Sequence, residues 1–126
     1  MAKEIFITTD APAPIGPYNQ AILAGNILFM SGQIALIPGT NDLNNSNIEE
    51  ETNQVMNNLK AVLQEAGLDF SNVAKTTIYL SDMSLFITVN EIYGKYFTGK
   101  FPARETVAVR SLPRNVNVEI SMIAVK

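Results

Sequence analysis

The segment between Asn47 and Gly67 constrains the fold most, because it predicts a long helix with one apolar face. Asn47 followed by Glu50 three residues later makes a capping-box-like start, and Gly67 stands where a C-terminal cap belongs. The acidic run from Glu49 to Glu51 favours the positive end of the helix dipole, and we interpret it as a solvated helix start rather than a metal site. Apolar residues at helical spacing mark the buried face: Val55, Met56, Leu59, Val62, Leu63 and Ala66.

Short apolar runs on both sides of this helix predict strands. Gly25-Asn26 separates two of these runs and is typical of a tight hairpin. The stretch from Asp10 to Pro17 contains three prolines and is expected to form a shaped loop, because proline lacks the N–H that strand pairing needs. The predicted strands run from Lys3 to Thr8, Tyr18 to Ala24, Ile27 to Ala35, Val73 to Ser81, Glu105 to Leu112 and Val116 to Val125.

A second helix is expected roughly from Ser84 to Phe97, with Asp82 or Ser84 as its cap. The element order β-β-β-α-β-α-β-β predicts an α+β fold, a mixed sheet with both helices on one face. A length of 126 residues fits one domain spanning residues 1–126. The second helix is more apolar than one sheet contact requires, which suggests an oligomer contact. Its two stripes are Leu85, Val89, Ile92 and Tyr96, and Phe86, Tyr93 and Phe97.

Composition limits the chemistry more than the fold. The chain has no cysteine and no histidine, so thiolate nucleophiles, imidazole bases and metal sites built on either residue are excluded. Nine basic against twelve acidic residues leave a net charge of −3, which disfavours nucleic acid as the main partner. No apolar run approaches the length of a membrane span or a signal peptide, and we expect a cytoplasmic protein.

Arg104 and Glu119 are the first candidates for a functional site. Arg104 follows Phe101-Pro102-Ala103 at the entry to a strand, and its planar guanidinium suits a carboxylate ligand. The alternative interpretation is that Arg104 is an ordinary surface arginine. Glu119 lies within a β-branched strand, where it needs either solvent or a partner, and it could position or deprotonate water. On residue type alone, exposure on the open side of the sheet is the simpler explanation for Glu119.

Three further positions are weaker candidates. Asn90 interrupts the Phe86, Tyr93 and Phe97 stripe, where its amide either caps a backbone group or meets a ligand. Tyr18 could lend a phenol to a pocket or pack its ring nearby. Ser31-Gly32 lacks the pattern of a hydrolase serine, and Gly32 is better explained as a point of close backbone approach.

Four ordered motifs across nearly the whole chain resemble those of the RidA family, also called YjgF. They are Ala13-Pro14-Ile15-Gly16-Pro17-Tyr18, Ser31-Gly32-Gln33, Val89-Asn90-Glu91-Ile92-Tyr93, and Pro102-Ala103-Arg104 through Leu112-Pro113 to Val118-Glu119-Ile120. The resemblance implies a chorismate-mutase-like fold assembled as a homotrimer with pockets between subunits. It also implies a cofactor-independent deaminase that hydrolyses 2-iminobutanoate and 2-iminopropanoate, imine or enamine products of pyridoxal-phosphate-dependent dehydratases, to 2-keto acids and ammonia.

The resemblance also implies roles for individual residues. Arg104 would hold the substrate carboxylate and Glu119 would orient the attacking water. Tyr18, Ser31 and Asn90 would line the site, while backbone groups near Gly32 and Thr106 would hold the imine and water. No metal is expected.

Two positions depart from the family pattern. Thr106 stands where many relatives have cysteine, and Glu105 follows the arginine where a small residue is usual. Strand alternation should point Glu105 away from Arg104 and Thr106.

The main alternative function is a regulatory or chaperone-like module that binds a small carboxylate or a partner with little turnover. A ribonuclease activity has also been attached to the family, but the acidic balance and lack of histidine argue against it.

Overall fold

Helix α1 (Ile48–Glu65) begins and ends as its capping residues predict in the computed structural model, which describes residues 2–126. Asn47 Oδ1 accepts a hydrogen bond of 2.8 Å from the Glu50 N–H. Just past the other end, Gly67 has a φ of 74°, a left-handed conformation in which a Cβ would be strained. All six apolar positions of the predicted buried face are buried, so this helix is confirmed in extent and orientation.

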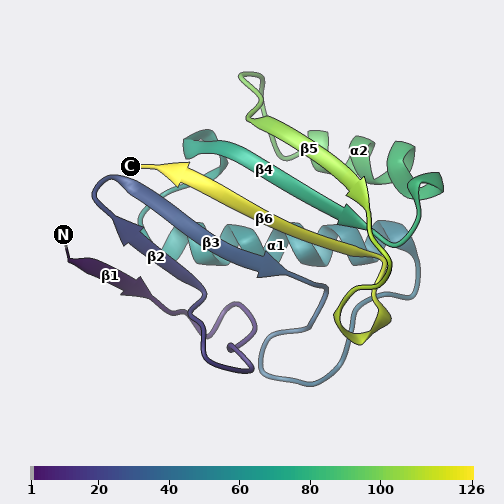
Figure 1. Cartoon of the computed structure of the whole chain (residues 1–126), viewed down its shortest axis with the longest axis horizontal. Coiled ribbons are helices and arrows are strands. Elements are labelled where there is room, and N and C mark those ends of the chain that lie inside the picture. Colours follow the sequence, from purple (N-terminus) through teal and green to yellow (C-terminus); the bar gives the residue numbers. More distant parts are fainter. Residues whose placement is uncertain (1) are drawn as a thin grey trace.

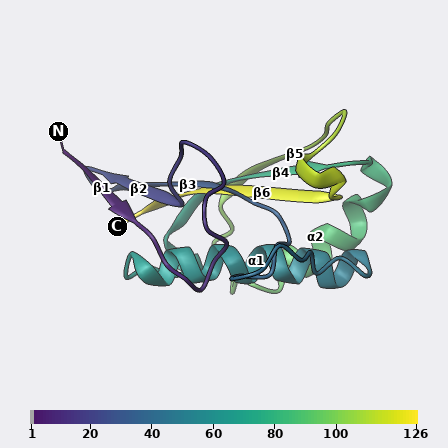
Figure 2. The same cartoon turned by 90° about the horizontal axis from the view of Figure 1, so that it is seen from below.

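The strands form one six-stranded sheet with the order β1-β2-β3-β6-β4-β5. Only β4 and β5 pair in parallel, and every other pairing is antiparallel, so the sheet is mixed as predicted. Figure 2 shows α1 and α2 (Phe86–Gly94) below the same face of the sheet, which confirms the α+β architecture. In chain order, and labelled as in Figure 1, the strands are β1 (Lys3–Phe6), β2 (Ala21–Ala24), β3 (Ile27–Gln33), β4 (Val73–Leu80), β5 (Ala103–Ala108) and β6 (Val118–Val125).

Several strands are shorter than predicted, because buried polar side chains take the backbone groups that strand partners would otherwise use. Gln20 accepts a hydrogen bond from the Thr8 N–H at 2.7 Å and donates to Thr8 O at 3.0 Å, so β1 ends at Phe6 and β2 begins only at Ala21. Asn58 Nδ2 donates to Ile34 O and Leu36 O, just beyond the end of β3. The predicted strand from Glu105 to Leu112 instead spans Ala103–Ala108.

The prediction of a solvated acidic run is confirmed for Glu49 and Glu50, which are exposed, but is wrong for Glu51. Its side chain is fully buried. Oε2 accepts hydrogen bonds from the backbone N–H groups of Asn117 at 2.7 Å and Val118 at 3.0 Å, and Oε1 accepts one from Asn117 Nδ2 at 3.1 Å. Glu51 therefore ties the first turn of α1 to the start of β6, and β6 begins at Val118 rather than at Val116.

Helix α2 is also shorter than predicted. A 3₁₀ turn, Met83–Leu85, precedes it, and Asp82 caps that turn by accepting a 2.7 Å hydrogen bond from the Ser84 N–H. After Gly94 the chain continues to Phe97 in tighter turns with hydrogen bonds between residues three apart. The two apolar stripes pack within the chain, because Val89, Ile92 and Tyr93 are buried and the remaining members contact the core. Packing within the chain accounts for part of this apolar face, and the oligomer contact at α2 stays a prediction.

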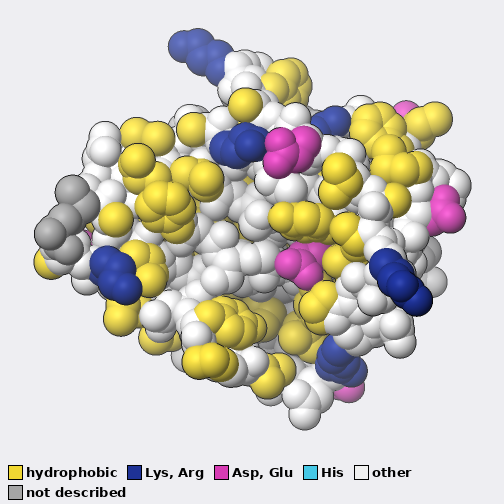
Figure 3. All heavy atoms as spheres, viewed as in Figure 1, with side chains coloured by type: hydrophobic (Ala, Val, Ile, Leu, Met, Phe, Trp, Pro, Cys, Tyr) yellow, Lys and Arg dark blue, Asp and Glu magenta, His cyan; other side chains and the backbone are white. Residues whose placement is uncertain are grey.

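A row of exposed apolar side chains lies on the sheet face opposite the helices. Strand pairing aligns Ile5, Ile22, Phe29 and Ile123 across β1, β2, β3 and β6. The side chains of Ile5 and Phe29 are 54% and 48% exposed. Figure 3 views the molecule from this side and shows apolar side chains gathered over the sheet. We refer to this surface as the open sheet face.

The hydrogen bonds of Gln20 generate a first prediction. Gln20→Leu keeps a similar side-chain volume but removes every partner that this amide supplies to the loop after β1. We expect the free energy of unfolding to fall by about 2–4 kcal/mol, because buried backbone groups lose their partners. Urea denaturation measures this change. Asn57→Leu, on the exposed side of α1, is the control and should shift stability by less than about 0.5 kcal/mol. Equal stability of the two variants would contradict the assignment.

Candidate active site

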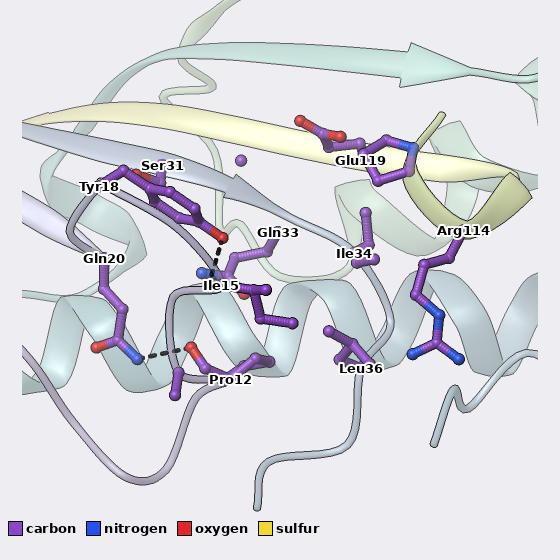
Figure 4. Close-up of a pocket in the computed structure, with 13 residues that line it drawn as sticks. Pro12, Ile15, Tyr18, Gln20, Ser31, Gln33, Ile34, Leu36, Arg114 and Glu119 are labelled. Carbon is purple, nitrogen blue, oxygen red and sulfur yellow. Dashed lines mark hydrogen bonds between the residues drawn. The ribbon is translucent and has the colours of Figure 1, made fainter. Parts of the chain in front are cut away.

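A pocket on the open sheet face has a volume of about 620 Å³. Three chain segments form its walls: the proline-rich loop before β2, the end of β3 with the residues after it, and the turn before β6. Figure 4 shows Tyr18 and Glu119 on one side of the pocket and Leu36 and Arg114 on the other. The lining residues are Pro12, Ala13, Ile15, Tyr18, Gln20, Ser31, Gly32, Gln33, Ile34, Leu36, Pro113, Arg114 and Glu119.

A β-bulge places Glu119 over Gly32. Met30 pairs with Met122 and Gln33 pairs with Ile120, so two residues of β3, Ser31 and Gly32, stand opposite one residue of β6. A Cβ at Gly32 would overlap the Glu119 carboxylate and would lie 3.0 Å from its Cδ and 3.2 Å from its Cγ. Only glycine leaves room for this side chain to cross β3, which confirms close approach as the reason for Gly32.

The environment of Glu119 favours a proton acceptor that works closer to neutral pH than an ordinary carboxylate. The side chain is half-buried, and burial raises its pKa. Among residues 2–126, no basic group lies within ion-pair distance of this carboxylate to oppose that effect. A carboxylate with a raised pKa next to a pocket is a recognised arrangement for general-base chemistry.

Tyr18 and Ser31 line the same pocket as Glu119. The Tyr18 hydroxyl accepts a 3.3 Å hydrogen bond from the Ile15 N–H, so the ring helps to shape the loop that forms the pocket wall. The Ser31 hydroxyl donates to Asn19 O at 2.5 Å, and the Ser31 N–H donates to Gln20 O at 2.9 Å. Ser31 thus joins β3 to the segment before β2, and its hydroxyl proton is already engaged within the chain.

Arg104 lies on the other side of the sheet, next to α2. It lines a second hollow of about 440 Å³ together with Asn90, Tyr93, Gly94, Phe101 and Pro102. Its guanidinium carbon stands 5.2 Å from the ring centre of Tyr93 and 5.7 Å from that of Phe86. No carboxylate among residues 2–126 forms an ion pair with it. Aromatic rings therefore hold the cation by their faces, while its hydrogen-bond donors remain available for an anion.

The residues that follow Arg104 in β5, Glu105 and Thr106, point to opposite faces of the sheet. Glu105 points to the open sheet face, where it lies 3.3 Å from Lys75 Nζ, so the prediction that it points away from Arg104 is confirmed. The buried Oγ1 of Thr106 has no hydrogen-bond partner within the part of the chain that the structure describes. Tyr93 donates its phenol hydrogen to Thr76 Oγ1 at 2.9 Å, and burial raises the pKa of Tyr93.

The predicted site residues thus fall into two groups on opposite faces of the sheet. Tyr18, Ser31, Gly32 and Glu119 belong to the open-face pocket, whereas Arg104 and Asn90 line the hollow beside α2. Within one chain, Arg104 and Glu119 do not face the same cavity. The registers explain this, because Arg104 pairs with the buried Thr76, whose side chain faces the helices, while Glu119 pairs with Tyr79 on the alternate face.

The anchoring roles of three buried polar residues, Gln20, Glu51 and Asn58, were not predicted from the sequence. Glu51 and Asn58 lie on the predicted apolar face of α1, and a polar residue at such a position is the one signal that could have identified them. Within residues 2–126, no three acidic side chains are grouped closely enough to share a metal ion. In the same residues, neither helix combines the length and apolarity that a membrane span requires.

Comparison with known proteins gives a consistent family assignment. The chain is 47% identical to the mouse (Mus musculus) protein named 2-iminobutanoate/2-iminopropanoate deaminase, over 98% of this chain and 92% of the mouse protein. The solved structure of the Rid family protein YyfA from Yersinia pestis has a TM-score of 0.96 at 46% identity, covering 99% of this chain and 100% of that chain. The E. coli protein TdcF, solved with bound serine, has a TM-score of 0.93 at 35% identity, covering 98% of each chain.

The family model described as endoribonuclease L-PSP matches residues 8–126. The match includes all four sequence motifs and both groups of candidate site residues. The chain therefore belongs to the endoribonuclease L-PSP family, the same family as RidA and YjgF.

Proposed function

We propose that this chain is a cofactor-independent deaminase that hydrolyses 2-iminobutanoate and 2-iminopropanoate to 2-keto acids and ammonia. The observation that carries the proposal is the half-buried Glu119 carboxylate, with its raised pKa, lying across Gly32 in the pocket on the open sheet face. The unpartnered Arg104 supplies a site for a carboxylate, and mouse and human relatives carry the name of this activity. A ribonuclease activity is less compatible with a net charge of −3 and no histidine.

The proposed reaction needs few groups. Arg104 binds the substrate carboxylate through two parallel hydrogen bonds. Glu119 takes a proton from water as the water oxygen bonds to C2 of the protonated imine, which gives a carbinolamine. Glu119 then returns that proton to the nitrogen. As the C–N bond breaks, the Glu119 carboxylate takes the hydroxyl proton, which gives the 2-keto acid, and passes it to the released ammonia, which leaves as ammonium. Because a protonated imine is already electrophilic, the protein mainly supplies orientation and a placed water.

The separation of Arg104 from Glu119 leads us to propose that each site is assembled from two copies of the chain. A cyclic homotrimer satisfies this requirement, because the Arg104 surface of each copy meets the Glu119 pocket of the next. The apolar open sheet face, which includes Ile5 and Phe29, is a surface that such an assembly would cover. The likeness to the RidA family supports the same arrangement.

Removing the proton acceptor should stop turnover. Glu119→Gln keeps the shape of the side chain, and we expect the rate to fall about 10²- to 10⁴-fold while the protein remains folded. In the wild type, activity should be lost as the pH falls through the raised pKa of Glu119, so the acidic limb should lie above the range of an ordinary carboxylate. The assay generates iminobutanoate with a dehydratase and follows keto-acid release above spontaneous hydrolysis. A folded Glu119→Gln variant with near-normal turnover would reassign Glu119 to structure.

Arginine geometry should matter as well as charge at position 104. Lysine cannot reproduce the two parallel hydrogen bonds, so Arg104→Lys should lose about 2–4 kcal/mol of transition-state stabilisation, roughly 30- to 1000-fold in rate. Arg110→Lys, at an exposed position outside both pockets, is the matched control and should retain the wild-type rate. Thermal melting of both variants checks folding. If Arg104→Lys and Arg104→Ala both hydrolyse iminobutanoate at the wild-type rate, the carboxylate clamp is wrong.

A mixing experiment tests whether each site is shared between copies. Arg104→Ala and Glu119→Gln should each be nearly inactive alone. When equal amounts are unfolded and refolded together, about one quarter of the sites in random trimers would receive both wild-type residues, so about a quarter of wild-type activity should return. Light scattering should give about three chain masses. Failure to recover activity in mixed trimers would place Arg104 and Glu119 within one chain or outside the reaction.

A further inference from the structure

The buried carboxylate of Glu51 directs all three of its accepted hydrogen bonds to the two residues that precede Glu119. Its Oε2 accepts from the backbone N–H groups of Asn117 and Val118 at 2.7 Å and 3.0 Å. Its Oε1 accepts from Asn117 Nδ2 at 3.1 Å. Glu51 belongs to the first turn of α1 and has no ion-pair partner among residues 2–126. A charged side chain buried in this way is expensive unless its hydrogen bonds compensate, so these contacts hold it firmly in place.

The backbone N–H groups at the start of β6 need a hydrogen-bond acceptor because β3 does not pair with β6 there. Gln33 pairs with Ile120 in the last register pair between β3 and β6, so Asn117 and Val118 extend beyond the end of β3. On the other side, β4 supports this segment. The Ser81 N–H donates to Asn117 O at 3.0 Å, and the Ser81 hydroxyl donates to Asn117 Oδ1 at 2.8 Å. Asn117 is therefore held between Ser81 and Glu51.

The segment held in this way controls two parts of the pocket. Glu119 follows Val118 directly, and its side chain crosses Gly32 two residues after Asn117. The turn before Asn117 contributes Pro113 and Arg114 to the pocket wall. We propose that Glu51 is a positioning residue, whose buried carboxylate fixes the entry to β6 and thereby holds Glu119 across Gly32. The catalytic consequence rests on the proposed deaminase function.

The ionisation of Glu119 offers a direct measure of its position. Burial raises its pKa, so a looser β6 entry that admits water should lower that pKa towards the ordinary carboxylate value. Few other groups face it: Tyr79 is its register partner on β4, and Tyr18 and Arg114 line the same pocket. A titration that follows the assigned Glu119 carboxyl signal between about pH 3 and 8 reports this group.

Three variants separate positioning from general stability. Glu51→Ala removes the three hydrogen bonds that Glu51 accepts from Asn117 and Val118, while the bonds between Ser81 and Asn117 remain. Glu51→Gln preserves them, because its amide oxygen can accept from both backbone N–H groups. The Asn117 amide then turns over, so that it accepts from the introduced NH₂ group and donates to the Ser81 hydroxyl. Val62→Ala creates a cavity elsewhere on the buried face of α1 and is the control for lost stability.

The experiment combines steady-state kinetics with carbon NMR of the Glu119 carboxyl, which is assigned by its absence in Glu119→Gln. For Glu51→Ala, we expect kcat to fall at least about 10-fold with KM changed less than about 2-fold, because Glu119 is misplaced while Arg104 is untouched. The pKa of Glu119 should fall in the same variant. Glu51→Gln and Val62→Ala should retain both the wild-type kcat and the wild-type pKa of Glu119.

Two results would overturn the proposal. One is a kcat and a Glu119 pKa in Glu51→Ala that match those in Val62→Ala, because Glu51 would then contribute only stability. The other is a loss of kcat in Glu51→Gln as large as in Glu51→Ala. If Glu51→Ala does not fold, Glu51→Asp takes its place, because its carboxylate is one methylene too short. A wild-type protein without deaminase activity would refute the proposed function, while the NMR titration would still decide whether Glu51 positions Glu119.

Discussion

Burial of one face of α1 against the sheet organises the rest of this structure. Leu59 and Val55 on that face are completely buried and contribute to the single apolar core. Glu51 and Asn58 belong to the same buried face and are equally inaccessible to solvent. The helix therefore does more than cover the sheet: Asn58 binds the chain as it leaves β3, and Glu51 binds the chain as it enters β6. Helix α1 therefore supplies both the apolar face that packs against the sheet and the polar side chains that hold the ends of β3 and β6.

These polar anchors explain how a pocket forms at the end of a continuous sheet. Where β3 and β6 separate, their backbone groups would lack partners, and buried backbone groups without partners are strongly disfavoured. Gln20 provides the equivalent anchor for the loop after β1. Together the three side chains fix three pocket walls without filling the space between them. The β-bulge at Ser31 and Gly32 then lets Glu119 reach across the opening.

The two groups of candidate residues are held by different physical means. Glu119 depends on backbone geometry, since a side chain at Gly32 would occupy its place. Arg104 instead lies over the rings of Tyr93 and Phe86, which stabilise a cation without using its N–H donors. Strand alternation places the groups on opposite faces of the sheet, so a site that uses both requires a second copy of the chain. The open sheet face provides apolar surface for such contact.

Local pattern in the sequence was sufficient for the elements and for several individual residues. The Asn47 cap, the apolar face of α1, the role of Gly32 and the outward direction of Glu105 all depend on spacing within one segment, and the structure confirms each of them. Asp82 caps the 3₁₀ turn before α2 rather than the helix itself. Spacing could not reveal which strand faces share a cavity, because that depends on pairing between segments far apart in the chain. For the same reason, Glu51 resembled a solvated helix start until Asn117 and Val118 were placed beside it, 66 and 67 residues further along the chain. Only the tertiary structure decided that Arg104 and Glu119 lie on opposite faces, because strand register sets side-chain direction and no local pattern encodes register between distant strands.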